Sequence, residues 1–250
     1  GIIANFFPSA MVTDIPFLFP SAEVAWRVLD GPFGQRLSRM FVEQTGMRNL
    51  AFAEVGFRNM TNNVRPIRTP ADMRGLRMRV METPLYVTMM RALGATPTPI
   101  AWPEVYTALQ TGVVDGQENP IPSILMGRLH EVQRFVTMTG HVYGVDWFAV
   151  NERFFRGLPE DLQYILVDSA QIATAVSRGV SQLITAQGLE TLRAARVEVY
   201  VPTEAELGLF RRATQGPVIE WLRTRVDPAL INEALAAVEE VVRQQRAALR

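Results

Sequence analysis

One apolar pattern in the second half of the chain limits the folds that this sequence can adopt. Between Leu158 and about Ala195, apolar residues recur every three or four positions, as they do along one face of an α-helix. Pro159 stands in the first turn, and Glu160 and Asp161 follow at the end where the helix dipole favours negative charge. The apolar positions are Leu162, Ile165, Leu166, Ile172, Val176, Val180, Leu183 and Leu192.

A helix over this stretch is too long for one small domain. At about 1.5 Å per residue it would reach about 50 Å, whereas a small domain is about 30 Å across. We therefore expect the helix to bend near Gly179 or Gly188, or to run across two lobes of the protein.

The composition excludes several classes of function. The 250 residues are 48% hydrophobic and 20% charged, which is enough apolar material for one large core or two smaller ones. Basic and acidic residues both total 25, so no net field attracts nucleic acid or an acidic membrane surface. No run of about 18 uncharged apolar residues occurs, so we expect no membrane span. Any charged ligand must be held by local charges.

Cysteine and histidine offer little chemistry. The chain has no cysteine, which excludes disulfides, thiolate zinc sites and cysteine nucleophiles. Its two histidines, His130 and His141, have no HExxH context, and we expect each to be a hydrogen-bonded structural residue rather than a metal ligand.

The remaining pattern predicts an α/β protein. The first 20 residues are apolar and interrupted by three prolines, which predicts strand and irregular loop within a core. Ser21 is a suitable N-cap for a helix, and Gly46 is a suitable end for a second helix that begins at Phe33. Helices alternate with short strands, which indicates a mixed or parallel sheet. The expected strands include residues 49–57, 75–80, 96–100 and 197–201.

The segment from Gly75 to Pro120 is the richest in functional signals. In GLRMRV, Arg77 and Arg79 share one face of a strand, which makes that face cationic. Thr83 and Pro84 then open a helix, and a second helix opens at Pro103. Ligands of open α/β sheets collect where strands end and helices begin.

Arg79 is therefore a candidate anion ligand, since a guanidinium matches the two oxygens of a carboxylate. The alternative is an arginine paired with a neighbouring glutamate. Arg58 could supply a second contact to the same anion or be a solvated loop charge, and Trp102 could be a cavity wall or a core aromatic.

Two polar runs are also candidates. The run DGQEN contains Glu118 and Asn119, although its composition is that of a surface turn. YGVDWF places Asp146 and Trp147 in an apolar strand, where they could meet the hydroxyl groups of a ligand or follow ordinary strand alternation.

Enzyme motifs are missing from the chain. There is no GxGxxG, no GxxxxGK[ST] and no GxSxG, so the dinucleotide, P-loop and α/β-hydrolase signatures are absent. An α/β enzyme that acts on an anionic metabolite, with Arg79 as substrate clamp, stays open as an alternative. A protein that binds no small ligand is a third reading.

Several segments in order resemble one protein family. GLRMRV, ALGATPTPIAWPEVYTALQTGVVDGQENP, LHEVQRFVTMTGHVYGVDWFAVNERFF and LPEDLQ are similar to the substrate-binding proteins of tripartite ATP-independent periplasmic (TRAP) transporters, of the C4-dicarboxylate-binding DctP type. The similarity runs from about Asn5 to Asp168. It implies a two-lobed clamp, as in other periplasmic binding proteins, with a long helix that spans both lobes. It also implies a periplasmic location, no catalysis, no cofactor and no metal.

The resemblance assigns roles to single residues. Arg79 matches the arginine that holds the ligand carboxylate, Arg58 a second arginine, and Asn119 a supporting side chain. Trp102 matches the position of an aromatic residue that forms a wall of the ligand pocket in this family. The predicted ligand-binding residues are Arg79, Arg58, Asn119, Trp102, Asp146, Trp147 and Glu118. The implied ligand is a dicarboxylate, keto acid, sugar acid or aromatic acid, and the implied partners are the permease subunits of a TRAP transporter.

The resemblance also predicts how the chain divides. We expect residues 1–56 and 145–184 to form lobe I, and residues 57–144 and 185–250 to form lobe II. Strands at 49–57 and 144–151 are the expected crossings between the lobes. Members of the family usually have strand and helix units ahead of the segment that begins here, so we expect lobe I to lack its N-terminal part.

Overall fold

A computed structural model describes residues 2–248 of the chain. Its described strands form one mixed sheet in the order β3-β2-β4-β1-β5-β6, which confirms the predicted α/β class. β1 is antiparallel to β4 and β5, whereas β2 is parallel to β3 and β4, and β6 is parallel to β5. The strands are β1 (Met47–Asn62), β2 (Arg77–Val80), β3 (Thr96–Pro99), β4 (Gly116–Pro120), β5 (Phe135–Asn151) and β6 (Glu198–Tyr200).

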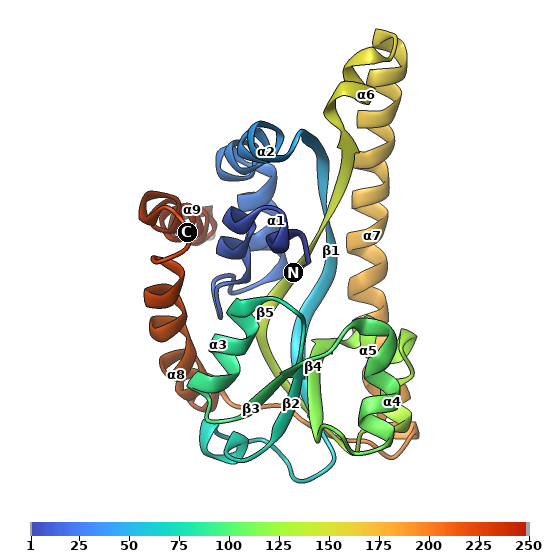
Figure 1. Ribbon diagram of the computed structural model, residues 1–250, viewed down its shortest axis with the longest axis vertical. Coiled ribbons are helices and arrows are strands. Elements are labelled where there is room, and N and C mark those ends of the chain that lie inside the picture. The colour runs from blue at the N-terminus through green and yellow to red at the C-terminus, as the bar shows by residue number, and fades with distance from the viewer. Residues whose placement is uncertain (1, 249–250) are drawn as a thin grey trace.

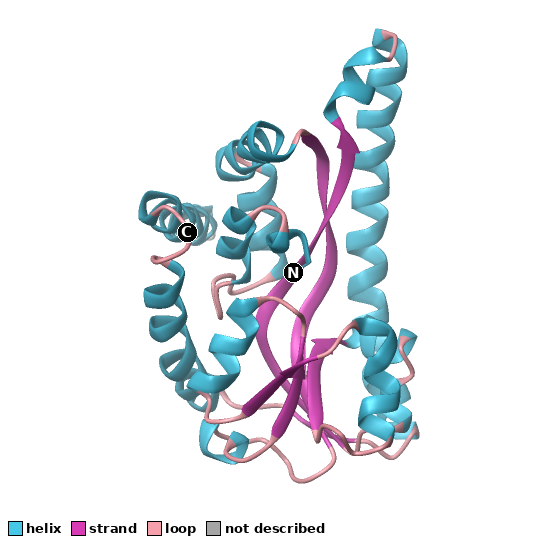
Figure 2. Ribbon diagram, viewed as in Figure 1, coloured by secondary structure: helices cyan, strands magenta, loops and turns pink. Residues whose placement is uncertain are grey.

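Helices cover both faces of this sheet, as Figure 2 shows. The predicted capping signals are used: the Ser21 side chain accepts a hydrogen bond from the Val24 amide, and Gly46 ends α2 with φ 68°. The helices are α1 (Ala22–Asp30), α2 (Pro32–Thr45), α3 (Pro84–Ala92), α4 (Val105–Gln110), α5 (Ile121–Met126), α6 (Glu152–Gly157), α7 (Glu160–Ala194), α8 (Glu204–Leu222) and α9 (Pro228–Ala248). The last two residues of the predicted helical tail lie outside the described residues.

β1 and β5 connect two parts of the molecule. They are 16 and 17 residues long, and in Figure 1 they run from the part that holds α1 and α2 to the part that holds β2, β3, β4 and α3 to α5. Their pairing shifts register at three places, between Asn49 and Phe52, between Glu54 and Gly56, and between Arg58 and Met60. Such irregularities bend a strand pair. The strands expected at 49–57 and 144–151 lie inside β1 and β5.

α7 confirms the long helix that the apolar pattern predicts. It is one helix of 35 residues, about 52 Å at about 1.5 Å per residue, and it runs along both parts of the molecule (Figure 1). Side chains of α7 bind backbone carbonyls of β1: Ser177 Oγ donates to Glu54 O at 3.2 Å, and Arg178 Nη2 donates to Phe52 O at 2.9 Å. α7 therefore supports β1 near its irregular pairing.

Two separate groups of buried apolar residues form the core, so the two-core reading of the composition holds. The larger group joins the N-terminal segment, α1, α2, α3, α8 and α9 to the sheet, and the smaller one lies around α4, α5 and the end of α7. Within residues 2–248, no helix combines the length and the apolar character that crossing a bilayer requires.

Two predictions about local structure are wrong. The N-terminal segment forms two 3-10 helices, Ile2–Asn5 and Pro8–Asp14, rather than a strand. Pro8 lies in the first turn of the second helix, where its missing N–H is not needed. The run DGQEN is not a surface turn: residues 116–120 form β4, which is buried throughout because β1 and β2 lie on either side.

Candidate functional site

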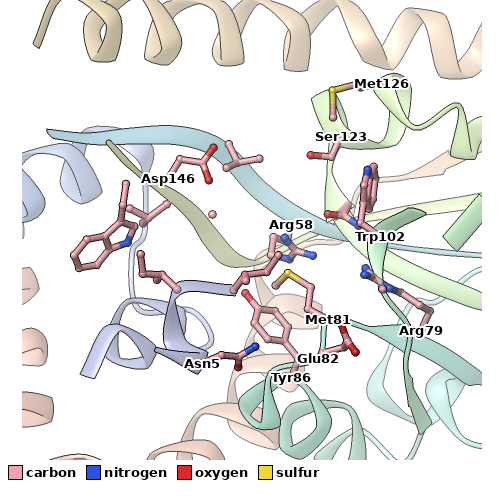
Figure 3. Close-up of a pocket in the computed structure, with 18 residues that line it drawn as sticks. Asn5, Arg58, Arg79, Met81, Glu82, Tyr86, Trp102, Ser123, Met126 and Asp146 are labelled. Carbon is pink, nitrogen blue, oxygen red and sulfur yellow. The ribbon is translucent and has the colours of Figure 1, made fainter. Parts of the chain in front are cut away.

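A cavity of about 470 Å³ lies where β1 and β5 pass the carboxyl end of β2 (Figure 3). Side chains reach it from β1, β2, β4, β5, α3, α5 and the 3-10 helix Trp102–Glu104. The structure brings together six of the seven residues that the sequence predicts. The six are Arg58, Arg79, Trp102, Asn119, Asp146 and Trp147.

Arg79 is a buried cation without a carboxylate partner. Its side chain comes from β2, and Nε donates to Ile100 O at 2.8 Å. Nη1 is buried and has no hydrogen-bond partner, and Arg79 forms no ion pair, among the described residues. Burial lowers the pKa of Arg79 to about 10, with Arg58 adding to this and Glu118 opposing it, so the guanidinium stays charged at neutral pH. The alternative of an Arg79–glutamate pair is therefore not what the structure contains.

Arg58 also lines the cavity, but unlike Arg79 it is paired with a carboxylate. Its Nε and Nη2 donate to the two carboxylate oxygens of Glu118 at 2.5 and 2.8 Å, and Nη2 also donates to Glu118 O at 2.7 Å. Burial acts to lower the pKa of Arg58, but the charge and hydrogen bonding of Glu118 together with the nearby Tyr86 and Asp14 outweigh it, so the pKa is raised. Arg58 is not a solvated loop charge, because only 5% of it is exposed.

Glu118 does not line the cavity, unlike the other predicted residues. It is completely buried and orients Arg58. Burial acts to raise the pKa of Glu118, but Arg58 and His141 lower it to about 2. Its place in the structure is that of a support for Arg58, whereas the sequence placed it among the ligand contacts.

His141 completes this buried cluster. Its Nε2 lies 3.1 Å from Glu118 Oε2, and its Nδ1 lies 2.8 Å from Thr139 Oγ1. Burial lowers the pKa of His141 although Glu118 opposes the change, so the ring is neutral at pH 7. We therefore assign the proton to Nε2, which donates to the carboxylate, while Nδ1 accepts from Thr139. His141 is the hydrogen-bonded structural histidine that the sequence predicts.

His130 differs from that prediction, since its Nδ1 is buried without a partner among the described residues. No group of three or more His, Cys, Asp or Glu side chains within residues 2–248 is arranged to hold a metal ion.

Asn119 is held by a chain of amides and hydroxyls. Its Nδ2 donates to Gln117 Oε1 at 2.5 Å, and Gln117 Nε2 donates to Thr61 Oγ1 at 3.0 Å, which in turn donates to Gln133. These bonds use one of the two Nδ2 hydrogens of Asn119. They also explain how β4 buries a polar sequence, because each amide is hydrogen-bonded within the sheet.

Asp146 and Trp147 follow each other on β5 but differ in environment. The Asp146 carboxylate is exposed in the cavity and lies across from Ser123 in Figure 3. Partial burial raises the pKa of Asp146. The Trp147 ring packs edge-on against Phe41 and Phe52, with ring centres 5.0 and 4.8 Å apart. Trp147 is therefore mainly a core aromatic that also reaches the cavity.

Several residues that line the cavity were not predicted from the sequence. Tyr86 and Ser123 come from the first turns of α3 and α5, directly after β2 and β4. The signal that could have identified them is their position in the first turn of a helix that follows a strand, because ligands of α/β sheets bind there. The other missed polar and large apolar residues are Asn5, Met81, Glu82 and Met126.

The comparisons with known proteins agree with this geometry. A family model described as bacterial extracellular solute-binding protein, family 7 (DctP), matches residues 1–223. A solute-binding protein of Verminephrobacter eiseniae is 41% identical over 199 residues, which are 80% of this chain and 59% of that protein. The chain thus spans less than two thirds of that relative.

Solved structures share the fold. A TRAP periplasmic solute-binding protein of Polaromonas sp. JS666 bound to D-erythronate is 36% identical with a TM-score of 0.87, over 95% of this chain and 76% of that one. The sugar acid binding protein DctPAm of Advenella mimigardefordensis in complex with galactonate is 32% identical with a TM-score of 0.90, over 96% and 76%. These likenesses confirm the predicted two-lobed clamp with its long helix. The chain belongs to family 7 of the bacterial extracellular solute-binding proteins, the DctP family.

Proposed function

We propose that this protein binds a small organic acid anion and that Arg79 holds the ligand carboxylate, with Arg58 and Asn119 beside it. The observation that carries this proposal is the guanidinium of Arg79. It is buried at the cavity, charged at neutral pH and unpaired by any carboxylate of the described residues. A buried charge without a partner is costly, and an entering carboxylate would compensate it.

The charges around the cavity support an anionic ligand. Arg58 is neutralised by Glu118, and His141 is neutral, so the positive charge of Arg79 is left over in this buried group. Interactions between charges are stronger here than in water because the surroundings are less polarisable. One negative charge on the ligand would compensate the charge of Arg79.

Apolar enclosure must add to this attraction. A hydrogen bond to a charged group contributes about 1.5–3 kcal/mol net, whereas micromolar affinity requires about 8 kcal/mol. Trp102, Met81 and Met126 supply apolar surface around the same cavity. Burying part of the carbon skeleton of the ligand against them supplies the remainder.

We propose hydroxylated acids, such as sugar acids, as the ligand class. Asp146 and Ser123 place a carboxylate and a hydroxyl at the cavity, on side chains other than those that hold the acid group. A carboxylate accepts hydrogen bonds from neighbouring hydroxyls of such a ligand. The solved relatives with D-erythronate and galactonate support this choice.

We further propose that the protein binds its ligand without catalysis, outside the cytoplasm and specifically in the periplasm, and delivers it to the membrane subunits of a TRAP transporter. The matched family and the TRAP relatives support this role. The enzyme alternative gains no support from them. The lobe boundaries, at residues 56, 144 and 184, stay a prediction.

Calorimetric titration with a panel of organic acids tests this function. Arg79→Ala should weaken the binding of the best acid at least about a hundredfold, because it removes about 3 kcal/mol of charge-assisted bonding. Arg77→Ala is the matched control: Arg77 lies on the same strand but is exposed and paired with Asp115, so affinity should not change. Undiminished binding by Arg79→Ala, or turnover of the acid into a product, would contradict the proposal.

A further inference from the structure

The Trp102 indole rests directly on Gly127. A β-carbon placed on Gly127 would lie 2.9 Å from both Cη2 and Cζ2 of Trp102 and 3.2 Å from Ser123 O. Real β-carbons do not approach other atoms to 2.9 Å, so the contact exists only because residue 127 has no side chain. Gly127 follows α5 directly, and Trp102 begins the 3-10 helix ahead of α4.

The backbone at residue 127 does not itself require glycine. Its φ is −80° and its ψ is 2°, which any L-amino acid adopts. This separates Gly127 from the glycines at positive φ, such as Gly112 at 72°. The close approach of the indole is therefore the one feature of this position that excludes a side chain.

The contact determines where one wall of the cavity stands. Trp102 lines the cavity with Ser123 and Met126 from α5, whereas Gly127 does not line it. The indole thus contacts the backbone position of Gly127 and also lines the cavity, where Figure 3 shows it beside Ser123. Trp102 is 36% exposed and lines the cavity, so part of its surface is not covered by other side chains.

We propose that Gly127 is a positioning residue: by letting the Trp102 indole lie back against the chain, it sets the size of the acid that the cavity accepts. This inference rests on the proposed function and extends it to ligand size. A β-carbon at 127 needs about 3.5–4.0 Å to the ring carbons, so the indole must shift by roughly 0.6 Å or more into the cavity. Larger acids would lose more affinity than small ones.

Fluorine NMR of protein labelled with 5-fluorotryptophan tests the position of the ring without any ligand. The chain has four tryptophans, so four resonances are expected, and Trp102→Phe identifies that of Trp102. In Gly127→Ala, the Trp102 resonance should shift while the other three stay in place. Gly157→Ala is the control, because no atom lies within 4 Å of a β-carbon there.

Titration with a four-carbon and a six-carbon sugar acid, erythronate and galactonate, tests the effect on size. Gly127→Ala should lower the affinity for galactonate about tenfold more than the affinity for erythronate, the range expected when a cavity loses the volume of one methyl group. In a Trp102→Phe background the ring atoms that meet the β-carbon are absent. Gly127→Ala should then leave the ratio of the two affinities unchanged.

The possible negative results distinguish the role of Gly127 from the proposed function. An unmoved Trp102 resonance, equal losses for both acids, or the same change of ratio in the Trp102→Phe background would overturn the role of Gly127. A wild-type protein that binds no organic acid would instead overturn the proposed function.

Discussion

Two arginines of the site region, Arg58 and Arg77, are each paired with a carboxylate. Arg58 and Glu118 neutralise each other, and His141 supports that pair as a neutral donor. Arg77 is balanced by Asp115 at the surface. Arg79 is unpaired among the described residues that line the cavity. Arg79 is thus a buried arginine without an ion pair among the described residues, and it faces the proposed ligand.

The distinction between Arg77 and Arg79 marks how far the sequence could predict the site. Strand alternation predicts that both arginines lie on one face of the strand, but it does not predict their partners. Their partners come from other parts of the chain: Asp115 lies 38 positions after Arg77, and Glu118 lies 60 positions after Arg58. Local pattern contains no information on such pairs. The position of Arg79 near the end of a strand made it a candidate anion ligand, and the family resemblance assigned the ligand carboxylate to it.

At the scale of single residues, Asp146→Asn should separate hydroxylated acids from plain ones. The variant replaces a charged acceptor by a neutral one, which weakens hydrogen bonds from ligand hydroxyls by about 1 kcal/mol, or about fivefold. Hexanoate has no such hydroxyls and should bind no less well, since a like charge is removed. Calorimetric titrations with galactonate and hexanoate check this, and equal losses for the two acids would contradict a role of Asp146 in selectivity.

His141 should make stability depend on pH. Burial lowers its pKa below the ordinary 6.5, so the unfolded chain takes up a proton at a higher pH than the folded one. The free energy of unfolding should therefore fall as the pH drops from about 6.5 to about 5, by at most about 1.4 kcal/mol per pH unit. Denaturant titrations between these pH values measure the slope.

His141→Gln is the comparison for that slope. The variant removes the titrating ring and leaves all other groups in common, so the difference between the two pH profiles belongs to His141. Glu118 affects the free energy of unfolding at lower pH. Its pKa is about 2 in the folded protein and about 4.5 ordinarily, so its contribution to stability is lost as the pH falls from about 4.5 to about 2. Identical profiles between pH 6.5 and 5 would show that His141 does not titrate as described.

At the scale of elements, β4 shows why a polar sequence can form an interior strand. GQENP has the composition of a turn, yet its polar groups are bonded to Thr61, Arg58 and His141 from neighbouring strands. Those partners exist only after β1, β4 and β5 are assembled. Elements with local signals were predictable, such as α1 from Ser21 and α2 from Gly46. Elements stabilised by tertiary bonds were not.

α5 and α7 meet at a glycine that tests their packing. A β-carbon on Gly188 would lie 2.5 Å from Ile121 Cγ2 and 2.9 Å from Leu125 Cδ1. Gly188→Ala should therefore lower the free energy of unfolding by about 1–3 kcal/mol through overpacking. Gly179→Ala is the matched control in the same helix, because its β-carbon would have no neighbour within 4 Å.

The control should change in the opposite direction. Alanine is favoured over glycine inside a helix by about 0.5–1 kcal/mol, so Gly179→Ala should stabilise the protein slightly. Denaturation in guanidinium chloride measures both variants under one set of conditions. A shift of both proteins in the same direction would contradict the close packing of α5 on α7.

At the scale of the whole molecule, β1, β5 and α7 join the two parts that flank the cavity. The length of α7 was predictable, because its apolar positions and their spacing lie within one stretch of sequence. The cavity was not predictable, because it is lined by residues from Ile2 to Trp147 that only the assembled fold brings together. Because acidic and basic residues are equal in number, the proposed ligand would be attracted by the charges of the site and not by a net charge of the molecule.

Ligand binding should stabilise the whole chain. At a ligand concentration about a hundred times the dissociation constant, mass action adds about 2.7 kcal/mol to the free energy of unfolding. For a chain of this size that corresponds to a rise in Tm of about 5–10 °C. A thermal-shift measurement with the best acid checks the rise, which should vanish in Arg79→Ala and persist in Arg77→Ala. Equal rises in the two variants would place the ligand elsewhere.

The contact between Gly188 and α5 lies far from the middle of α7. The contact with Ile121 lies close to one end of the helix, and the first turn at Glu160 is roughly 40 Å away at about 1.5 Å per residue. If α7 tilted by about 5° about the Gly188 contact, its first turn would move by about 4 Å. Because Ser177 and Arg178 bind α7 to β1 between these two points, such a tilt would also move β1.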